Sequence, residues 1–258
     1  MVDVLLNCLI QILSTLGMIL ISGQIIAFFN KLFYKIVGSK GRVICYVTGF
    51  IGTPLHELGH VLMCVIFGHK IHKINFYSPN SPDGTLGYVS HSYNKNNLWQ
   101  KAGNFFIGVG PIIIGYLALF GLLYLLLPEL LLSAVDRLQY IDFADNSIQS
   151  LKGFFEIFVE LFKGAVFWQW WVFIFLGSFI ALHMTLSKPD LEGAMSGLIL
   201  CLLAFLAVNT ISALISMAIV KEITCIMLIL FNFMLFFFCI FLMIIVVMCA
   251  LAKVIVRR

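Results

Sequence analysis

The sequence predicts an all-α polytopic membrane protein with about six transmembrane helices and a short membrane-associated β-hairpin after the second. Of its 258 residues, 62% are hydrophobic and only 11% are charged, whereas soluble domains are nearer 45–50% apolar and about 25% charged. Several apolar runs reach the roughly 20 residues that a helix needs to cross a bilayer. These runs are continuous rather than alternating, which argues against a β-barrel. The net charge of +4 suits a lipid bilayer with anionic headgroups and gives no indication of nucleic-acid binding.

The apolar runs place the six spans in order along the chain. Asp3 stands where a secretory signal would carry basic residues, so we interpret the first run as a retained span. Pro111 predicts a kink in the third span. No soluble domain of useful size remains, and residues 1–258 are predicted to form a single membrane-embedded domain. The predicted spans are Val4–Phe29, Val43–Phe67, Leu98–Leu127, Val166–Leu186, Leu191–Ile219 and Thr224–Val254.

Two connections are longer than simple loops. Lys70–Phe76 and Thr85–Tyr93 are strand-like and flank the turn-forming segment Ser78–Gly84, which predicts a β-hairpin. The strand Thr85–Tyr93 either accepts an extended substrate by strand addition or belongs to a self-contained hairpin. The connection at about 128–165 carries aromatic and aliphatic residues at helical spacing. It is either an interfacial amphipathic helix or a segment packed against the bundle.

The seven cysteines all lie in or beside apolar runs, and no two are spaced as a C-x-x-C pair. We interpret them as small apolar packing residues rather than disulfide partners or metal ligands.

The second predicted span contains the sequence His56-Glu57-Leu58-Gly59-His60, an H-E-x-x-H motif. On a helix, residues four apart face the same side, so both imidazoles can reach one Zn²⁺ ion. Glu57 is not expected to be a ligand. It can take a proton from water and return it to a leaving amine. A Glu at membrane depth is costly, so such residues usually mark function.

A zinc site of this kind needs a third protein ligand. Asp190 is the preferred candidate, because Pro189 breaks the apolar run and leaves Asp190 near the start of the fifth span, where a carboxylate suits the helix dipole. Glu192 and His183 are the alternatives. We interpret the other histidines as interfacial residues of the hairpin; they are His69, His72 and His91.

These residues make the chain resemble the site-2 protease family of intramembrane zinc metalloproteases. The likeness rests on His56, Glu57 and His60 and on Asp190 within the segment Lys188–Gly193, and it covers roughly residues 43–200. The resemblance implies zinc held by the two histidines and the aspartate, with the glutamate as general base. It also implies an extended substrate paired with a membrane-associated strand. The spacing of Asp190 is similar to that of small bacterial members, which implies a bacterial cell membrane.

The chain departs from the family in two respects. The family often has Leu-Asp-Gly at the third ligand, whereas Leu191-Glu192-Gly193 carries Glu at that place and Asp190 lies two residues earlier. Many members also carry a PDZ domain, for which this chain has no room.

The expected activity is zinc-dependent hydrolysis of a peptide bond in a membrane-anchored protein or peptide, with a catalytic core at about 43–200. Asn104, in the third span, either contacts the substrate or caps a helix break. Two alternative functions remain open. One is a membrane zinc hydrolase that acts on a lipid or another non-peptide bond, and the other is a non-catalytic metal-binding protein or transporter.

Overall fold

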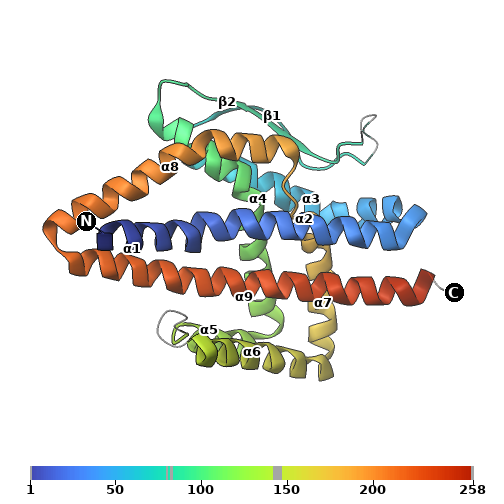
Figure 1. The fold of residues 1–258 in the computed structure, drawn as a ribbon. Coiled ribbons are helices and arrows are strands. Elements are labelled where there is room, and N and C mark those ends of the chain that lie inside the picture. Colours follow the sequence, from blue (N-terminus) through green and yellow to red (C-terminus); the bar gives the residue numbers. More distant parts are fainter. Residues whose placement is uncertain (1, 80, 82–83, 142–146, 257–258) are drawn as a thin grey trace.

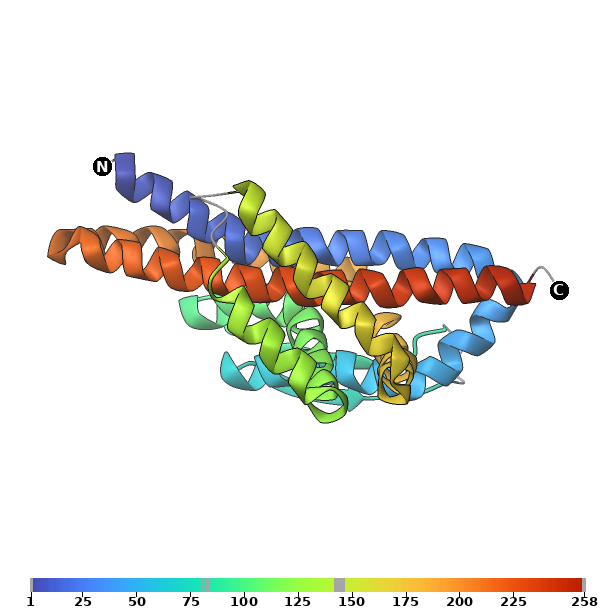
Figure 2. The same ribbon diagram turned by 90° about the horizontal axis from the view of Figure 1, so that it is seen from below.

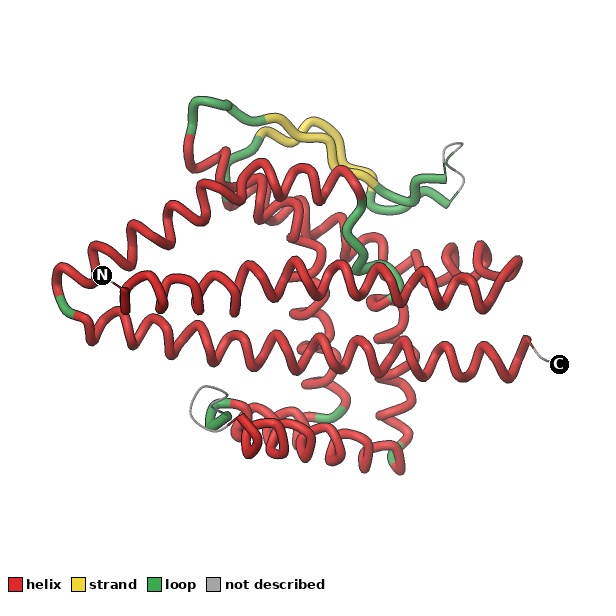
Figure 3. The backbone as a smooth tube through the Cα atoms, viewed as in Figure 1, coloured by secondary structure: helices red, strands yellow, loops and turns green. Residues whose placement is uncertain are grey.

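The computed structural model describes residues 2–79, 81, 84–141 and 147–256. The described chain is largely helical, and its only strands form one small antiparallel sheet (Figure 3). The elements in order are α1 (Val2–Ile12), a π-helical turn (Leu13–Gly17), α2 (Met18–Val37), a 3-10 turn (Gly38–Lys40), α3 (Gly41–Ile66), β1 (Lys70–Asn75), β2 (Tyr88–Ser92), α4 (Leu98–Leu126), α5 (Pro128–Leu138), α6 (Ser147–Lys163), a 3-10 turn (Gly164–Val166), α7 (Trp168–Ala181), α8 (Lys188–Ile215) and α9 (Met217–Val256).

The helices run in two main directions. The continuous helix α1–α2 lies beside the long helix α9, and both cross the molecule from one side to the other in Figure 1 and in the turned view of Figure 2. Helices α4 and α7 cross this pair steeply, with the hairpin at one of their ends and the α5–α6 pair at the other (Figure 1). The two sets of helices therefore cannot all lie along one membrane normal.

The described residues contain four helical segments that are long and apolar enough to cross a membrane, or up to five if α6 and α7 form one bent span. The sequence predicted six. The first two predicted spans lie within one run, Val2–Ile66, which changes direction at Gly38, where φ is +56°. The fourth differs most, because α7 has only 14 residues and is about 21 Å long. It meets α6 at 110°.

Helices α3, α4 and α8 pack closely because glycines line their contacts. A Cβ on Gly59 of α3 would lie 2.6 Å from backbone atoms of Gly110 and Pro111 on α4. A Cβ on Gly108 would collide with the backbone oxygen of Asp190 on α8. The absence of side chains at these glycines allows the helix backbones to meet almost directly. This contact brings the motif on α3 and the start of α8 to one place.

The hairpin forms where it was predicted, with shorter strands. β1 and β2 pair antiparallel from Lys70 opposite Ser92 to Asn75 opposite Tyr88, with an irregularity between Ile71 and Lys73. The predicted strand Thr85–Tyr93 is shorter in the structure, because residues 85–87 and 93 are not paired with β1. The predicted turn is described except at residues 80, 82 and 83, which lie outside the described residues.

The connection at about 128–165 forms two helices, with residues 142–146 outside the described part. Arg137 of α5 donates to Glu160 of α6 over 2.8 Å. One face of α6 is buried against the rest of the molecule through Phe154, Ile157 and Leu161, while Phe155 is 67% exposed. The helix is thus packed against the bundle and also presents an apolar outer face.

Candidate metal centre and catalytic site

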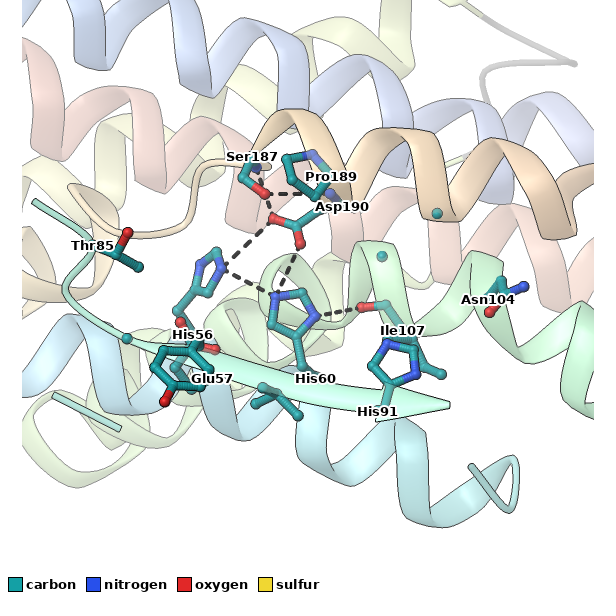
Figure 4. Close-up of a pocket in the computed structure, with 15 residues that line it drawn as sticks. His56, Glu57, His60, Thr85, His91, Asn104, Ile107, Ser187, Pro189 and Asp190 are labelled. Atoms are coloured by element: carbon teal, nitrogen blue, oxygen red, sulfur yellow. Dashed lines mark hydrogen bonds and ion pairs between the residues drawn. The ribbon is translucent and has the colours of Figure 1, made fainter. Parts of the chain in front are cut away.

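His56 and His60 on α3 and Asp190 at the start of α8 converge on one point (Figure 4). The two Nε2 atoms lie 3.2 Å apart. His60 Nε2 is 3.3 Å from Asp190 Oδ1, and His56 Nε2 is 3.8 Å from Asp190 Oδ2. We call these three residues together with Glu57 the motif site.

The hydrogen bonds of the two imidazoles leave their Nε2 atoms free to bind a cation. His56 Nδ1 donates to the backbone oxygen of His183, and His60 Nδ1 donates to that of Ile107, each over 2.8 Å. A carbonyl oxygen can only accept, so each Nδ1 carries the proton and each Nε2 of the neutral ring presents a lone pair. Two nitrogen lone pairs 3.2 Å apart beside a carboxylate repel one another unless a cation binds between them. Two nitrogens bound to one tetrahedral zinc ion would lie about 3.3 Å apart, so the residues present fit such an ion.

Asp190 is oriented by the start of α8. Ser187 is the N-cap: its hydroxyl accepts from the Asp190 N–H over 3.3 Å, and its own N–H donates to Asp190 Oδ2 over 2.7 Å. This reciprocal capping box directs Oδ1 toward His60. Glu192 lies two residues on, about 200° around the helix, where its exposed carboxylate faces Lys188 at 3.7 Å. Of the two acidic candidates, the structure brings Asp190 to the histidines and leaves Glu192 outside.

His183, the third candidate ligand, supports the site through its backbone. Its ring lies between two threonines of α3, with Nε2 3.0 Å from Thr48 Oγ1 and Nδ1 3.3 Å from Thr53 Oγ1. The Thr48 hydroxyl donates to the backbone oxygen of Ile44, so it accepts from His183 Nε2, and Thr53 donates to Nδ1. The ring is occupied by these bonds, while the carbonyl of the same residue holds His56.

Glu57 is 5% exposed, and its carboxylate forms no hydrogen bond or ion pair with the residues that the structure describes. Gly87, just before β2, lies directly over it: a Cβ at Gly87 would lie 2.8 Å from Glu57 Cγ and 2.8 Å from Thr53 Cγ2. Glu57 lines the same cavity as His56 and His60, and its carboxylate remains available to a small polar molecule.

A cavity of about 440 Å³ opens onto the motif site. One wall is formed by the segment leading into β2 and by β2 itself, through Thr85, Gly87, Tyr88, Val89 and His91. Asn104 also lines the cavity, beyond Ile107 on the side away from His56 (Figure 4). Part of the predicted substrate strand and Asn104 thus border the same space as the predicted metal ligands.

A second group of possible ligands lies at the end of α3. Donor atoms of Cys64, His69 and His91 lie within 4.8 Å of one another, and we call these residues the Cys64 cluster. His69 and His91, expected as interfacial hairpin residues, have their Nδ1 atoms 3.1 Å apart. Burial is the largest effect lowering the pKa of His91, and the neighbouring imidazoles, beginning with His69, lower it further.

The sequence interpretation missed the Cys64 cluster. All seven cysteines are free, as expected, but Cys64 lies among possible metal ligands rather than only among packing residues. Its position one helical turn after His60 was the available signal, since it continues the face that carries the motif.

Comparisons of this chain with protein-family models, with curated proteins and with solved structures found no match. The function is therefore inferred from the residues of the two clusters and from their geometry.

Proposed function

We propose that this protein is an intramembrane zinc metalloendopeptidase of the site-2 protease type, which hydrolyses a peptide bond in a membrane-anchored protein or peptide. The observation that carries the proposal is the joint orientation of His56 and His60. Backbone oxygens hold both Nδ1 atoms, so both Nε2 atoms point at Asp190 beside the unpartnered Glu57. The long apolar helices around the site favour a substrate that itself lies in the bilayer.

His56, His60 and Asp190 would hold the ion. Bound zinc supplies Lewis acidity, which makes a water molecule more acidic and a peptide carbonyl more electrophilic. Glu57 takes one proton from the attacking water as the water oxygen bonds to the carbonyl carbon. The carbon–nitrogen bond then breaks, and Glu57 delivers that proton to the leaving nitrogen. The products are a carboxyl group and an amine.

The hairpin offers a way to present an extended substrate. Within the described residues, β2 is paired on one edge, with β1, and residues of β2 line the cavity. An extended segment that adds to a free edge gains backbone hydrogen bonds. Such a segment must first leave its helical form, because helical peptide groups in a bilayer are already hydrogen-bonded internally.

Glu57→Gln tests the proposal most directly. The substitution keeps the side chain's size and removes its basicity, so we expect zinc binding to persist and hydrolysis to fall by about 10²–10⁴-fold. The readout is the set of membrane-protein fragments in cells that carry each variant. Glu192→Gln makes the same chemical change at an exposed position outside the site, and it should leave the fragments unchanged.

Identical fragment sets in wild-type and Glu57→Gln cells would overturn the proposal. If the protein fragments are the same in both cells but a lipid product disappears in Glu57→Gln cells, the site acts on a non-peptide bond. If zinc binds and no product of any kind changes, the motif site binds metal without catalysis.

A further inference from the structure

The Cys64 cluster is assembled by the turn that ends α3. The N–H of Gly68 donates to the backbone oxygen of Val65 over 3.2 Å, and the N–H of His69 donates to that of Cys64 over 2.8 Å. Gly68 has a φ of +71°. These are the two bonds and the left-handed residue of a Schellman motif. The turn reverses the chain and brings His69 back against Cys64.

The hydrogen bonds of His69 direct one nitrogen into the cluster. His69 Nε2 donates to the backbone oxygen of Gln100 over 2.7 Å, so Nδ1 of the neutral ring presents its lone pair to His91. The Gln100 side chain strengthens this corner, because its amide donates to the Gly68 oxygen and accepts from the Asn94 N–H. The ring of His69 also stacks on Tyr93, with centroids 5.0 Å apart.

Cys64 completes a donor set of one sulfur and two nitrogens. Its side chain is fully buried, and its thiol forms no hydrogen bond with the described residues. Thiolate and imidazole together favour zinc-class ions over calcium or magnesium, which prefer oxygen. His91 lines the cavity of the motif site, so a water molecule there can supply a fourth ligand.

We propose that Cys64, His69 and His91 bind a zinc-class cation that ties the hairpin to the end of α3. The three ligands come from α3, from the turn before β1 and from β2, so one ion would connect all three. β2 forms a wall of the cavity, and the ion would hold that wall in place. This assignment does not depend on the proposed hydrolysis, because the motif site contributes none of the three ligands.

Metal content and the cobalt spectrum of the purified full-length protein test the proposal. Zinc is measured per chain in the wild type, Cys64→Ser and Asp190→Ala, after removal of loosely bound metal. Cobalt(II) is then loaded in place of zinc, because a thiolate bound to cobalt gives a near-ultraviolet charge-transfer band and imidazole or carboxylate ligands do not. Cys201→Ser is the matched control, since Cys201 is also buried, at 5% exposure, and lies on α8.

We expect two zinc ions per chain in the wild type and in Cys201→Ser, and one each in Cys64→Ser and Asp190→Ala. The cobalt band should be present in the wild type, Asp190→Ala and Cys201→Ser and absent in Cys64→Ser. The proposal is overturned if the wild type shows no thiolate band, or if the band is still present in Cys64→Ser. Neither outcome requires any variant to be active. If Asp190→Ala is the only variant that loses zinc, the proposal for the Cys64 cluster is overturned, while the assignment of a zinc ion to the motif site still stands.

Discussion

The motif site and the Cys64 cluster share one face of α3, yet they draw their other ligands from different distances along the chain. Asp190 reaches His56 and His60 from 130 residues downstream, because helices α3, α4 and α8 meet at glycines. His69 and His91 reach Cys64 through a tight turn and a hairpin within the next 27 residues. Of the two clusters, the motif site alone contains a carboxylate that has no partner among the described residues. The difference is consistent with the hydrolysis proposed for the motif site and with the tethering proposed for the Cys64 cluster.

Apart from substitution of Glu57 itself, the largest decrease in activity is expected from a change in helix packing, which affects the motif site and not the Cys64 cluster. Gly59→Ala adds a methyl group 2.6 Å from the α4 backbone, which must push α3 and α4 apart. A displacement of about 1 Å at a catalytic site can cost about 100-fold in rate, so we expect hydrolysis of a membrane substrate to fall by that factor. Gly121→Ala, on α4, is the control, because its Cβ would meet nothing within 4 Å and Gly121 is not among the residues that line the cavity. Equal activities in the two variants would show that the close contact does not set the geometry of the site.

The orientation of His56 depends on the backbone oxygen of His183, whose ring is held by two threonines. Thr48→Val combined with Thr53→Val removes both hydrogen bonds of the His183 ring and frees the carbonyl that holds His56. Loss of outer partners of metal ligands typically lowers affinity 10–100-fold. We expect such a decrease for zinc at the motif site, measured by chelator competition. The cobalt–thiolate band should be unchanged. Thr210→Val, on the exposed side of α8, should alter neither.

The reverse experiment weakens the Cys64 cluster alone. Gln100→Leu removes the side-chain bonds that hold the Gly68 turn and Asn94 and leaves the backbone oxygen that orients His69. We expect about 10-fold weaker cobalt binding in the thiolate-containing site, at the lower end for outer partners. Zinc affinity at the motif site should not change. A parallel decrease at both sites would mean that the two clusters are coupled.

The smallest expected effect comes from the cap of α8. Ser187→Ala removes the hydroxyl that accepts from Asp190 N–H, which costs about 1 kcal/mol at a helix N-terminus. This corresponds to an affinity decrease of about 5-fold if the cap and the bound ion stabilise the same orientation of Asp190. Titration of zinc into the apo protein measures it. Ser196→Ala, on the same helix and with its hydroxyl donating to the backbone oxygen of Gly193, should bind zinc as the wild type does.

The local parts of the fold were largely predictable. Periodicity and composition placed the motif on a helix and a hairpin directly after it, because both depend on neighbouring residues. The length of α7 was not predictable in the same way. Its apolar run continues beyond Ala181, but the chain leaves the helix there, and the side-chain amide of Asn30 on α2 donates to the backbone oxygens of Ala181 and Leu182. No pattern in the neighbouring sequence indicates that tertiary contact.

The residue types of the possible metal ligands in the motif site were predictable from the sequence. Which residue supplies the third of them was harder to predict. The Ser187-x-x-Asp190 spacing of a capping box distinguishes Asp190 from Glu192, since it fixes one acidic side chain at the first turn and turns the other away. The carbonyls of Ile107 and His183 could not be predicted, because every residue has a backbone oxygen. The Cys64 cluster was missed because spacing rules for cysteine pairs do not cover a lone cysteine joined by histidines from a turn and a strand.

The absence of a side chain at Gly87 sets how closely the hairpin lies on α3. Its backbone conformation suits any residue, because its φ is not among the positive values found in the described chain. A side chain there would nevertheless enter the space over Glu57 and Thr53. One methyl group, introduced without a change of charge or polarity, would lie 2.8 Å from Glu57 Cγ and 2.9 Å from the backbone oxygen of Asn75, so the hairpin or α3 would have to shift. The hairpin therefore rests on the helix that carries Glu57 with no room for even one additional carbon atom at this point.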